Sequence, residues 1–304
     1  MKRLADRARL LAEARAFFAS RGYLEVETPI AIPSPGLDLH LDAFEAVGGR
    51  TPRFLSTSPE YQMKRLLADG LPRIFQITRA FRAGELGERH NPEFTILEFY
   101  RAHAGAGAIM RDTEQLVARL TGGSVTVGGR TIDVRPPLER ITVCEAFERY
   151  AGVAPEETLR LAAEDEDTFF EKLAFVVEPE LAKLPRGVFV VDYPTTQASL
   201  ARKKPDDPRF AERFELYVAG VELCNGFGEL TDAVEQRARF VRDQEERARR
   251  GKPVYPIDER FLEALTSPGL PPCAGNAIGF DRVVALVCGT KAIGDVMSFT
   301  DGEL

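Results

Sequence analysis

Residues 73–101 carry side chains whose types and spacing suit the binding of a nucleotide beside a cationic molecule. Two segments of alternating apolar and polar residues flank a polar, glycine-containing loop, a pattern that predicts a β-hairpin. Arg82 lies at the base of this loop, and Phe94 follows on the second strand. Glu98 and Tyr100 are two residues apart, so a strand would point both to one face. An arginine, an aromatic ring and carboxylates on one face would suit a triphosphate, a purine and a cation.

A second candidate site lies on two strands that turn at Ala219-Gly220. Glu222 and Glu229 on the second of these strands have an odd separation, so a regular strand would point them to opposite faces. Gly226 and Gly228 permit a bulge that would bring both carboxylates to the same face. Two converging carboxylates beside a triphosphate would suit Mg²⁺, although a surface strand with scattered acids is the alternative interpretation.

A third candidate segment runs from residue 275 to residue 287 and predicts a strand followed by an apolar helix. Gly275 and Gly279 would let the backbone approach a nucleotide, and Arg282 at the helix start would contact a phosphate or stack on adenine. A glycine pattern alone is weak, but it gains weight from Arg82 and Glu222 upstream.

Periodicity and turn residues predict the elements that must position these side chains. The expected helices cover residues 3–20, a segment starting at Ser58-Pro59-Glu60, residues 141–150, 164–175 and 231–250, and a segment around Phe261. The expected strands cover residues 23–28, 39–47, 54–57 and 187–194, with a short hairpin over 123–134. Ser58 is the expected N-cap of its helix, and Glu60 would interact with either the helix dipole or a substrate.

The composition is that of a soluble globular protein of 304 residues, with 44% hydrophobic and 29% charged residues. A net charge of −7 argues against holding nucleic acid by bulk charge. Four widely spaced cysteines show no zinc spacing and predict reduced thiols in the cytoplasm. The sequence has no apolar segment long enough for a membrane span, so no membrane association is expected.

Three motifs of this chain resemble those of class II aminoacyl-tRNA synthetases, in the form used by the lysyl enzymes. Phe81-Arg82 with Arg89-His90-Asn91-Pro92-Glu93-Phe94-Thr95 and Leu97-Glu98-Phe99-Tyr100 resembles motif two, and the segment around 275–282 resembles motif three. The helix and the strand that ends at Pro29 resemble motif one, which builds the dimer interface in that family. The resemblance runs from about residue 5 to residue 300. It implies an α+β catalytic domain with a mainly antiparallel β-sheet flanked by helices.

The chain begins directly at motif one, which predicts a single domain over 1–304 without the OB-fold that reads the anticodon in lysyl-tRNA synthetases. A lysyl-like core alone resembles the elongation factor P–(R)-β-lysine ligase family. That resemblance implies ATP-dependent activation of lysine, or more specifically (R)-β-lysine, and its transfer to a lysine side chain of elongation factor P. Ala277 supports it, because lysyl-tRNA synthetases have glycine there. One methyl group is worth roughly 1–3 kcal/mol of discrimination.

The resemblance also implies roles for individual residues. Glu60 and Ser58 would hold the reacting-end amine, with Pro59 between them also in the substrate site. Glu98, Tyr100 and Glu229 would surround the distal ammonium. Asn225 would help to fix the carboxylate, and Ala277 would place its methyl group on the pocket floor. The residues implied for ATP are Arg82, Glu85, His90, Asn91, Phe94, Glu222, Leu223, Gly279 and Arg282. Arg82, Arg282 and Glu222 would act in the reaction, with Glu222 and Glu229 as Mg²⁺ ligands. No protein nucleophile is expected.

The motif-two loop departs from the lysyl pattern. Where the lysyl enzymes carry glutamate two residues after the motif-two arginine, this chain has Gly84, followed by Glu85. Either Glu85 replaces that contact or the contact is absent. A homodimer through residues 1–30 is expected, and no stable nucleic-acid complex. Two alternatives stay open: an enzyme that charges tRNA, and a non-catalytic paralogue that senses lysine.

Overall fold

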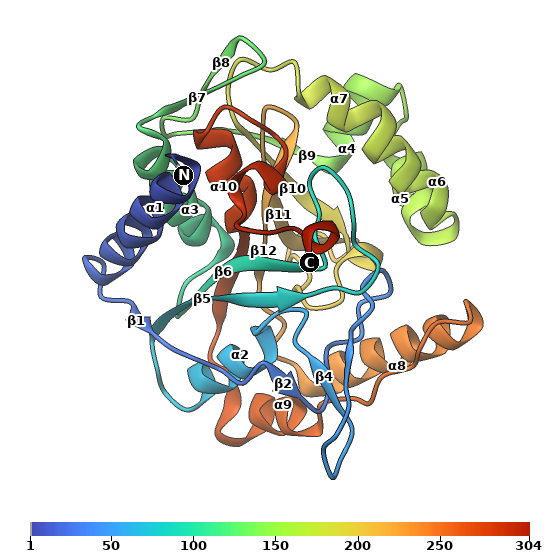
Figure 1. Ribbon diagram of the computed structural model, residues 1–304. Helices are drawn as coiled ribbons and strands as arrows, with labels where there is room; N and C mark the ends of the chain where they lie inside the picture. The colour runs from blue at the N-terminus through green and yellow to red at the C-terminus, as the bar shows by residue number, and fades with distance from the viewer. Residues whose placement is uncertain (1) are drawn as a thin grey trace.

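The computed structural model describes residues 2–304, with an eight-stranded sheet at its centre (Figure 1). The six central strands pair antiparallel, whereas the two edge strands pair parallel to their neighbours. In spatial order the strands are β1 (Leu24–Glu25), β5 (Arg73–Phe81), β6 (Glu93–Ala102), β13 (Cys273–Gly279), β12 (Val221–Gly228), β11 (Phe210–Val218), β10 (Val188–Pro194) and β9 (Glu139–Thr142). The predicted α+β class with a mainly antiparallel sheet is confirmed.

One face of the sheet is covered by three helices: α1 (Lys2–Ala19), α3 (Ala106–Thr121) and α10 (Phe280–Val287) (Figure 1). Side-chain alternation along β6 determines which residues face them. Leu97 and Phe99 are fully buried in this core, so Glu98 and Tyr100 between and beyond them face the opposite side. The apolar positions of the strands therefore orient the polar ones toward the site.

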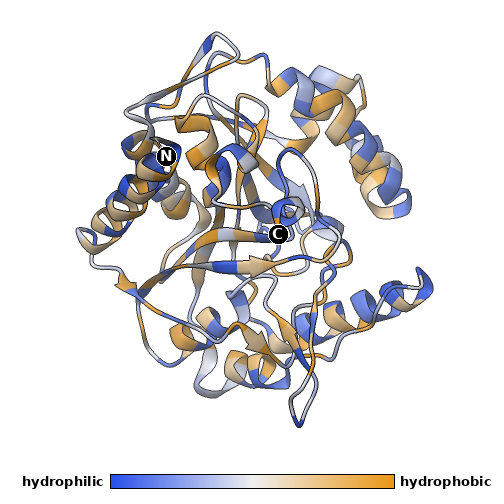
Figure 2. Cartoon of the chain, in the orientation of Figure 1, coloured by the Kyte–Doolittle hydropathy of each residue, from blue (hydrophilic) through white to orange (hydrophobic). Residues whose placement is uncertain are grey.

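The opposite face is covered only at its two ends. Helices α2 (Glu60–Ala68), α8 (Ala233–Arg249) and α9 (Glu259–Ala264) form a core at one end, and α4 (Val143–Ala146), α5 (Pro155–Glu164), α6 (Glu166–Lys172) and α7 (Glu178–Leu181) form a core at the other. Arg250 at the end of α8 forms an ion pair with Glu166 of α6 at 2.7 Å, and Figure 2 shows this end of α8 to be largely hydrophilic. The middle of this face is left for a cavity.

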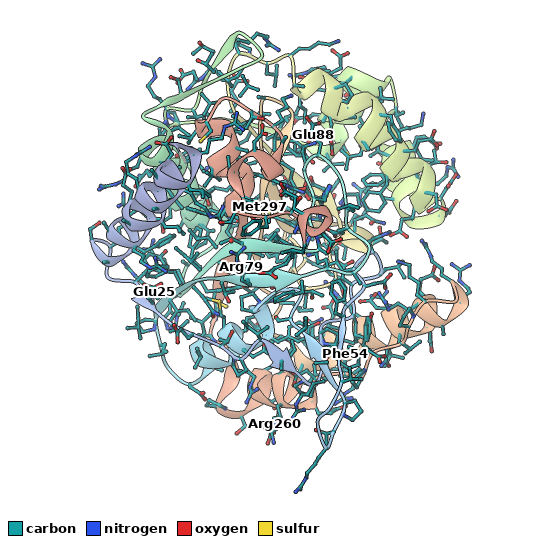
Figure 3. All side chains as sticks on the ribbon, in the orientation of Figure 1. Glu25, Phe54, Arg79, Glu88, Arg260 and Met297 are labelled. Atoms are coloured by element: carbon teal, nitrogen blue, oxygen red, sulfur yellow. The ribbon has the colours of Figure 1, made fainter. Side chains whose placement is uncertain are left out.

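The remaining elements are peripheral. A three-stranded sheet is formed by β2 (Ala31–Ile32), β4 (Arg53–Leu55) and β3 (Glu45–Ala46), and the predicted hairpin is formed by β7 (Ser124–Val127) and β8 (Arg130–Asp133). Short π and 3₁₀ segments cover Phe147–Ala151, Leu173–Val177, Thr195–Gln197, Leu265–Gly269, Ile293–Val296 and Asp301–Glu303. Arg79 and Met297, both labelled in Figure 3, line a second cavity of about 360 Å³. Among residues 2–304, no helix combines the length and apolarity that crossing a membrane requires.

The structure corrects several predicted elements. The helix predicted over 141–150 is wrong at its start, because Ile141 and Thr142 belong to β9, which gains hydrogen bonds by pairing with β10. The helix starts at Val143, where Thr142 and Glu145 form a capping box. The strand predicted over 39–47 is reduced to β3, and that over 23–28 to β1. Sequence periodicity missed α5, which begins at Pro155.

Gly226 on β12 is required for packing. A Cβ atom there would lie 2.2 Å from Phe214 Cζ and 2.8 Å from the carbonyl oxygen of Gly275. Gly226→Ala is therefore expected to lower the free energy of unfolding by about 2–3 kcal/mol, because the sheet must shift to admit the methyl group. Urea denaturation measures this. Gly302→Ala, where nothing lies within 4 Å, is the control, and equal stabilities of the two variants would contradict the close packing.

Candidate active site

A cavity of about 910 Å³ lies over the open face of the central sheet, between the two groups of helices. All three motifs contribute to its lining. Among the predicted site residues, the lining includes Ser58, Glu60, Arg82, Glu85, His90, Asn91, Phe94, Glu98, Glu222, Leu223, Asn225, Ala277, Gly279 and Arg282. Pro59, Tyr100 and Glu229 are described by the structure but lie outside this lining. The predicted residues thus converge on one space, with Tyr100 and Glu229 behind its wall.

Strand register brings residues from distant parts of the chain into one row. Glu98 on β6 pairs with Ala277 on β13, Ala277 pairs with Asn225 on β12, and Asn225 pairs with Glu215 on β11. Residues that pair directly across strands point to the same face. The sheet therefore places Ala277 between a carboxylate and an amide at the cavity floor.

A β-bulge brings Glu222 onto this face. Leu216 pairs with Cys224 and Tyr217 pairs with Glu222, so Leu223 is the extra residue on β12. The bulge reverses the alternation, and Glu222 joins Asn225 on the cavity side. The sequence predicted a bulge with this effect, but at Gly226 and Gly228 instead of Leu223.

Arg82 extends into the cavity immediately after β5. Its guanidinium lies 4.9 Å from the Phe94 ring centroid, and its Nη1 atom is 3.7 Å from Glu85 Oε1. Its buried Nε atom has no hydrogen-bond partner within the described chain. A partly exposed guanidinium with an unused buried donor is suited to an anionic ligand, which would satisfy that donor. Glu85, not Gly84, supplies the carboxylate beside Arg82.

Arg282 is, with Arg82, the other arginine of the motifs that lines the cavity. Its Nη1 atom donates to the Glu222 carbonyl oxygen at 2.9 Å and lies 3.3 Å from Glu222 Oε2. Its Nη2 atom lies 2.8 Å from His90 Nε2. Burial and the adjacent Arg282 charge lower the pKa of His90, so this imidazole is neutral and its Nε2 accepts from the guanidinium.

Asn91 lines the cavity as predicted, and its side-chain amide also makes two hydrogen bonds within the protein. Its Nδ2 donates to the Glu93 carbonyl at 2.7 Å, and its Oδ1 accepts from the Asp301 amide at 3.0 Å. Both ends of the amide are therefore engaged, and Asn91 fixes the motif-two loop against the C-terminal segment.

The other half of the cavity is acidic. Glu98 is fully buried, and its carboxylate accepts from Ser58 Oγ at 2.6 Å and from the Tyr100 hydroxyl at 2.8 Å. Burial, with a further contribution from the charge of Glu60, raises the pKa of Glu98 to about 7. Tyr100 therefore positions Glu98 from behind the wall. The Ser58 hydroxyl also accepts from the Glu60 amide at 3.1 Å. The prediction of Ser58 as the N-cap is wrong by one residue, because α2 begins at Glu60 and its N-cap is Pro59.

The raised pKa of Glu98 predicts a pH dependence for the binding of a cationic substrate. Below about pH 7 the carboxyl is protonated in the empty protein, and its attraction for an ammonium group is lost. We expect kcat/KM for the amino acid to rise with pH through about 7 and then level off. Glu98→Gln is expected to lower kcat/KM and to abolish this step. Initial rates between about pH 5.5 and 8 test it, and an unchanged profile in the variant would assign the step elsewhere.

Lys64, which no sequence pattern singled out, lies beneath this acidic region. Its side chain is fully buried, and its Nζ atom lies 2.5 Å from Glu60 Oε1 and 2.6 Å from Glu229 Oε2. Glu60 retains access to the cavity, whereas Glu229 is fully buried. The spacing of four residues between Glu60 and Lys64 places both side chains on one face of a helix, and this spacing could have predicted their ion pair.

The structure does not support a Mg²⁺ ion shared by Glu222 and Glu229. Glu222 is the second residue of β12 and Glu229 follows the end of that strand, and seven residues of extended chain span about 20 Å. Within residues 2–304, no group of three or more His, Cys, Asp or Glu side chains forms a metal cluster. Glu222 alone fits an ion bound mainly by phosphates, because Mg²⁺ is commonly held by one or two carboxylates plus substrate oxygens.

Arg213 lines the cavity and is another residue that the sequence analysis missed. It lies on β11, where its Nε donates to Asn225 Oδ1 at 3.2 Å and its Nη2 donates to Glu215 Oε1 at 2.6 Å. The Tyr193 and Tyr217 hydroxyls donate to the other oxygen of Glu215. The alternation of Arg213, Glu215 and Tyr217 with apolar residues was a readable signal of one polar strand face.

Comparison with known proteins places this geometry in a family. The family model described as tRNA synthetases class II (D, K and N) matches residues 1–302. Proteins from Salmonella dublin and Salmonella enteritidis PT4, both named "Elongation factor P--(R)-beta-lysine ligase", are 42% identical to this chain over 320 residues. The matches cover 98% of this chain and 94% of each relative. The chain therefore belongs to the class II tRNA synthetase family (D, K and N) and, within it, to the elongation factor P–(R)-β-lysine ligases.

Proposed function

We propose that this protein uses ATP to activate lysine, in particular (R)-β-lysine, and transfers it to a lysine side chain of elongation factor P. One observation carries the proposal: the lining of a single cavity includes Arg82 and Arg282 as well as the carboxylates of Glu60 and Glu98. The arginines suit a nucleotide, and the carboxylates suit a molecule with two ammonium groups. The names of the 42%-identical relatives support the same activity.

Activation would join the amino acid carboxylate to the α-phosphorus of ATP and release pyrophosphate. Arg82 would orient the carboxylate and the α-phosphate, and Arg282 would stabilise negative charge on the phosphates. Glu222 would hold Mg²⁺, which supplies charge neutralisation when bound. In the second step, the acceptor amine would attack the activated carbonyl and AMP would leave.

Ala277 would set the preference between lysine isomers, because its methyl group lies on the floor beside Glu98 and Asn225. We expect Ala277→Gly to shift the ratio of kcat/KM values toward α-lysine by about tenfold, as one methyl group allows. Pyrophosphate exchange with α-lysine and with both β-lysine enantiomers measures the ratio. A ratio that stays constant would show that another residue selects the isomer.

The experiment that tests the activity uses the same exchange assay and then follows the label. Pyrophosphate exchange that depends on lysine or β-lysine, followed by transfer to elongation factor P, supports the proposal. Exchange followed by charging of tRNA would instead support the alternative enzyme. Absence of exchange with every lysine isomer would support a lysine-sensing paralogue.

We also propose that the protein is a homodimer through residues 1–30. Leu4, Leu24 and Ile30 in this segment are exposed apolar residues, which supports an interface there. Light scattering coupled to gel filtration measures the mass. A monomer at micromolar concentration would contradict the proposal.

A further inference from the structure

Arg213 lines the cavity, but the activity proposed above, on which this inference rests, gives it no role. It lies on β11, two residues before Glu215, and only 16% of its side chain is exposed. Its guanidinium also lies 4.4 Å from the Tyr193 ring centroid. A guanidinium buried in this way needs hydrogen-bond partners, which either the protein or a ligand must supply.

The protein engages all three nitrogen atoms of this guanidinium. Nε donates to Asn225 Oδ1 at 3.2 Å, and Nη2 donates to Glu215 Oε1 at 2.6 Å. Nη1 donates to the carbonyl oxygen of Gln197. Because each nitrogen already has a partner in the protein, Arg213 is arranged to hold neighbouring groups in place and not to bind a ligand itself.

Glu215, the charged partner of Arg213, is fixed from its other side. The Tyr193 hydroxyl donates to Glu215 Oε2 at 2.6 Å, and the Tyr217 hydroxyl donates to the same oxygen at 2.8 Å. Tyr193 lies on β10 and Tyr217 on β11, so the network extends across two strands. Hydrogen bonds from both strands therefore hold the guanidinium in one orientation.

The hydrogen bond from Arg213 determines the orientation of the Asn225 amide. A guanidinium has only donors, so the Asn225 atom beside its Nε must be the acceptor Oδ1. The NH2 group is the other end of the amide, and within residues 2–304 it has no acceptor. Asn225 lines the cavity and pairs with Ala277 on its floor. Its Nδ2 donor therefore remains for an acceptor group of a ligand, such as a carboxylate oxygen.

We propose that Arg213 is a positioning residue that fixes the Asn225 amide with its NH2 group toward the substrate carboxylate. Without Arg213, the amide would have two orientations, and one of them would present Oδ1, which repels a carboxylate. Fixing the amide before binding also removes the cost of ordering it when the ligand arrives. Arg213 would thus select ligands that carry a carboxylate at this point, without touching them.

Lysine-dependent pyrophosphate exchange tests the proposal, with cadaverine as a competitive inhibitor. Cadaverine keeps the chain and both amines of lysine but lacks the carboxylate. Arg213→Lys keeps a positive charge near Glu215 and removes the Nε donor to Asn225. Asn225→Ala removes the amide, and the double variant removes both. Arg209→Lys, which changes an exposed arginine paired with Asp207 outside the cavity lining, is the matched control.

We expect Arg213→Lys to raise the KM for lysine about tenfold, the range for losing a hydrogen bond to a charged group. The Ki of cadaverine and the KM for ATP should stay within about twofold. In the Asn225→Ala background, the same substitution should raise the KM for lysine less than twofold. A residue that acts through another has no further effect once that other residue is gone. Arg209→Lys should match the unmodified protein.

Two results would overturn the proposal. Equal losses of lysine and cadaverine binding in Arg213→Lys would show a general disturbance of β11. A tenfold rise in the KM for lysine in both backgrounds would show that Arg213 binds the carboxylate itself.

Thermal melting shows whether Arg213→Lys folds, and Asn225→Asp decides if it does not. This variant keeps an acceptor for Arg213 and replaces the NH2 donor with an oxygen atom. Lysine should then bind at least tenfold more weakly and cadaverine no more weakly. Equal changes for the two ligands would overturn the proposal.

The outcomes separate this inference from the proposed function. An unmodified protein without lysine-dependent exchange would contradict the proposed function itself. Calorimetric titration of the same variants with lysine and cadaverine would then test the role of Arg213 on its own. A protein that binds lysine no more tightly than cadaverine would overturn the inference as well.

Discussion

Replacing Arg82 with alanine is expected to lower kcat/KM for lysine-dependent pyrophosphate exchange by about a thousandfold, the upper range for losing one preorganised donor group in a catalytic site. Arg82 lies over Phe94, and its buried Nε has no partner within the described chain. A group preorganised in this way stabilises charge that develops in the transition state without a cost for reorientation. We expect most of the loss in kcat, because the interaction strengthens as the phosphorus is attacked.

Arg79→Ala is the matched control for Arg82→Ala. Arg79 lies on the same strand, is half exposed and forms an ion pair with Glu93 at 3.5 Å, away from the cavity lining. It should exchange pyrophosphate at nearly the unmodified rate. Similar losses in both variants would point to a general disturbance of β5 and would remove Arg82 from the reaction.

Replacing Glu222 with glutamine is expected to lower the same rate by about a hundredfold or more and to raise the Mg²⁺ concentration that gives half-maximal activity. Two consequences follow from the lost charge. Mg²⁺ loses its protein carboxylate, and Arg282 loses the ion pair that orients its Nη1 atom at 3.3 Å. A titration of activity against Mg²⁺ at saturating ATP measures the effect.

The control for this variant is Glu263→Gln, an exposed carboxylate on α9. It should leave the Mg²⁺ titration unchanged. If Glu222→Gln kept the unmodified Mg²⁺ dependence but lost activity, Glu222 would serve only to orient Arg282. A second carboxylate, such as Glu215 on the neighbouring strand, would then be the group to examine as a metal ligand.

The parts of the fold that the sequence predicted are those governed by local pattern. Alternation along 73–101 placed β5 and β6 and the face that carries Glu98, and the glycines before Arg282 marked the change from β13 to α10. These signals depend on neighbours within a few residues. The segment 141–150 failed because β9 exists only through its pairing with β10, a contact far away in the sequence.

Site residues were predicted correctly where a local sequence motif identifies them. They were missed where their position depends on a contact with a residue far away in the sequence. Arg82, Glu98 and Arg282 were found from motifs, and the structure places all three on one cavity. The ion pair of Lys64 with Glu229 joins residues that are far apart in the sequence, and no local pattern reports it. Glu222 and Glu229 were predicted as Mg²⁺ ligands from the face of the strand that each would occupy. That argument does not say how far apart two residues lie along the strand.

The most direct test is a crystal structure with a non-hydrolysable sulfamoyl analogue of lysyl-adenylate. We expect the adenosine beside Phe94 and Arg282, the sulfamoyl group at Arg82, and the two ammonium groups at Glu60 and Glu98. An analogue that bound with its ammonium groups away from both carboxylates, or outside this cavity, would contradict the proposed division of the cavity into a nucleotide half and an amine half.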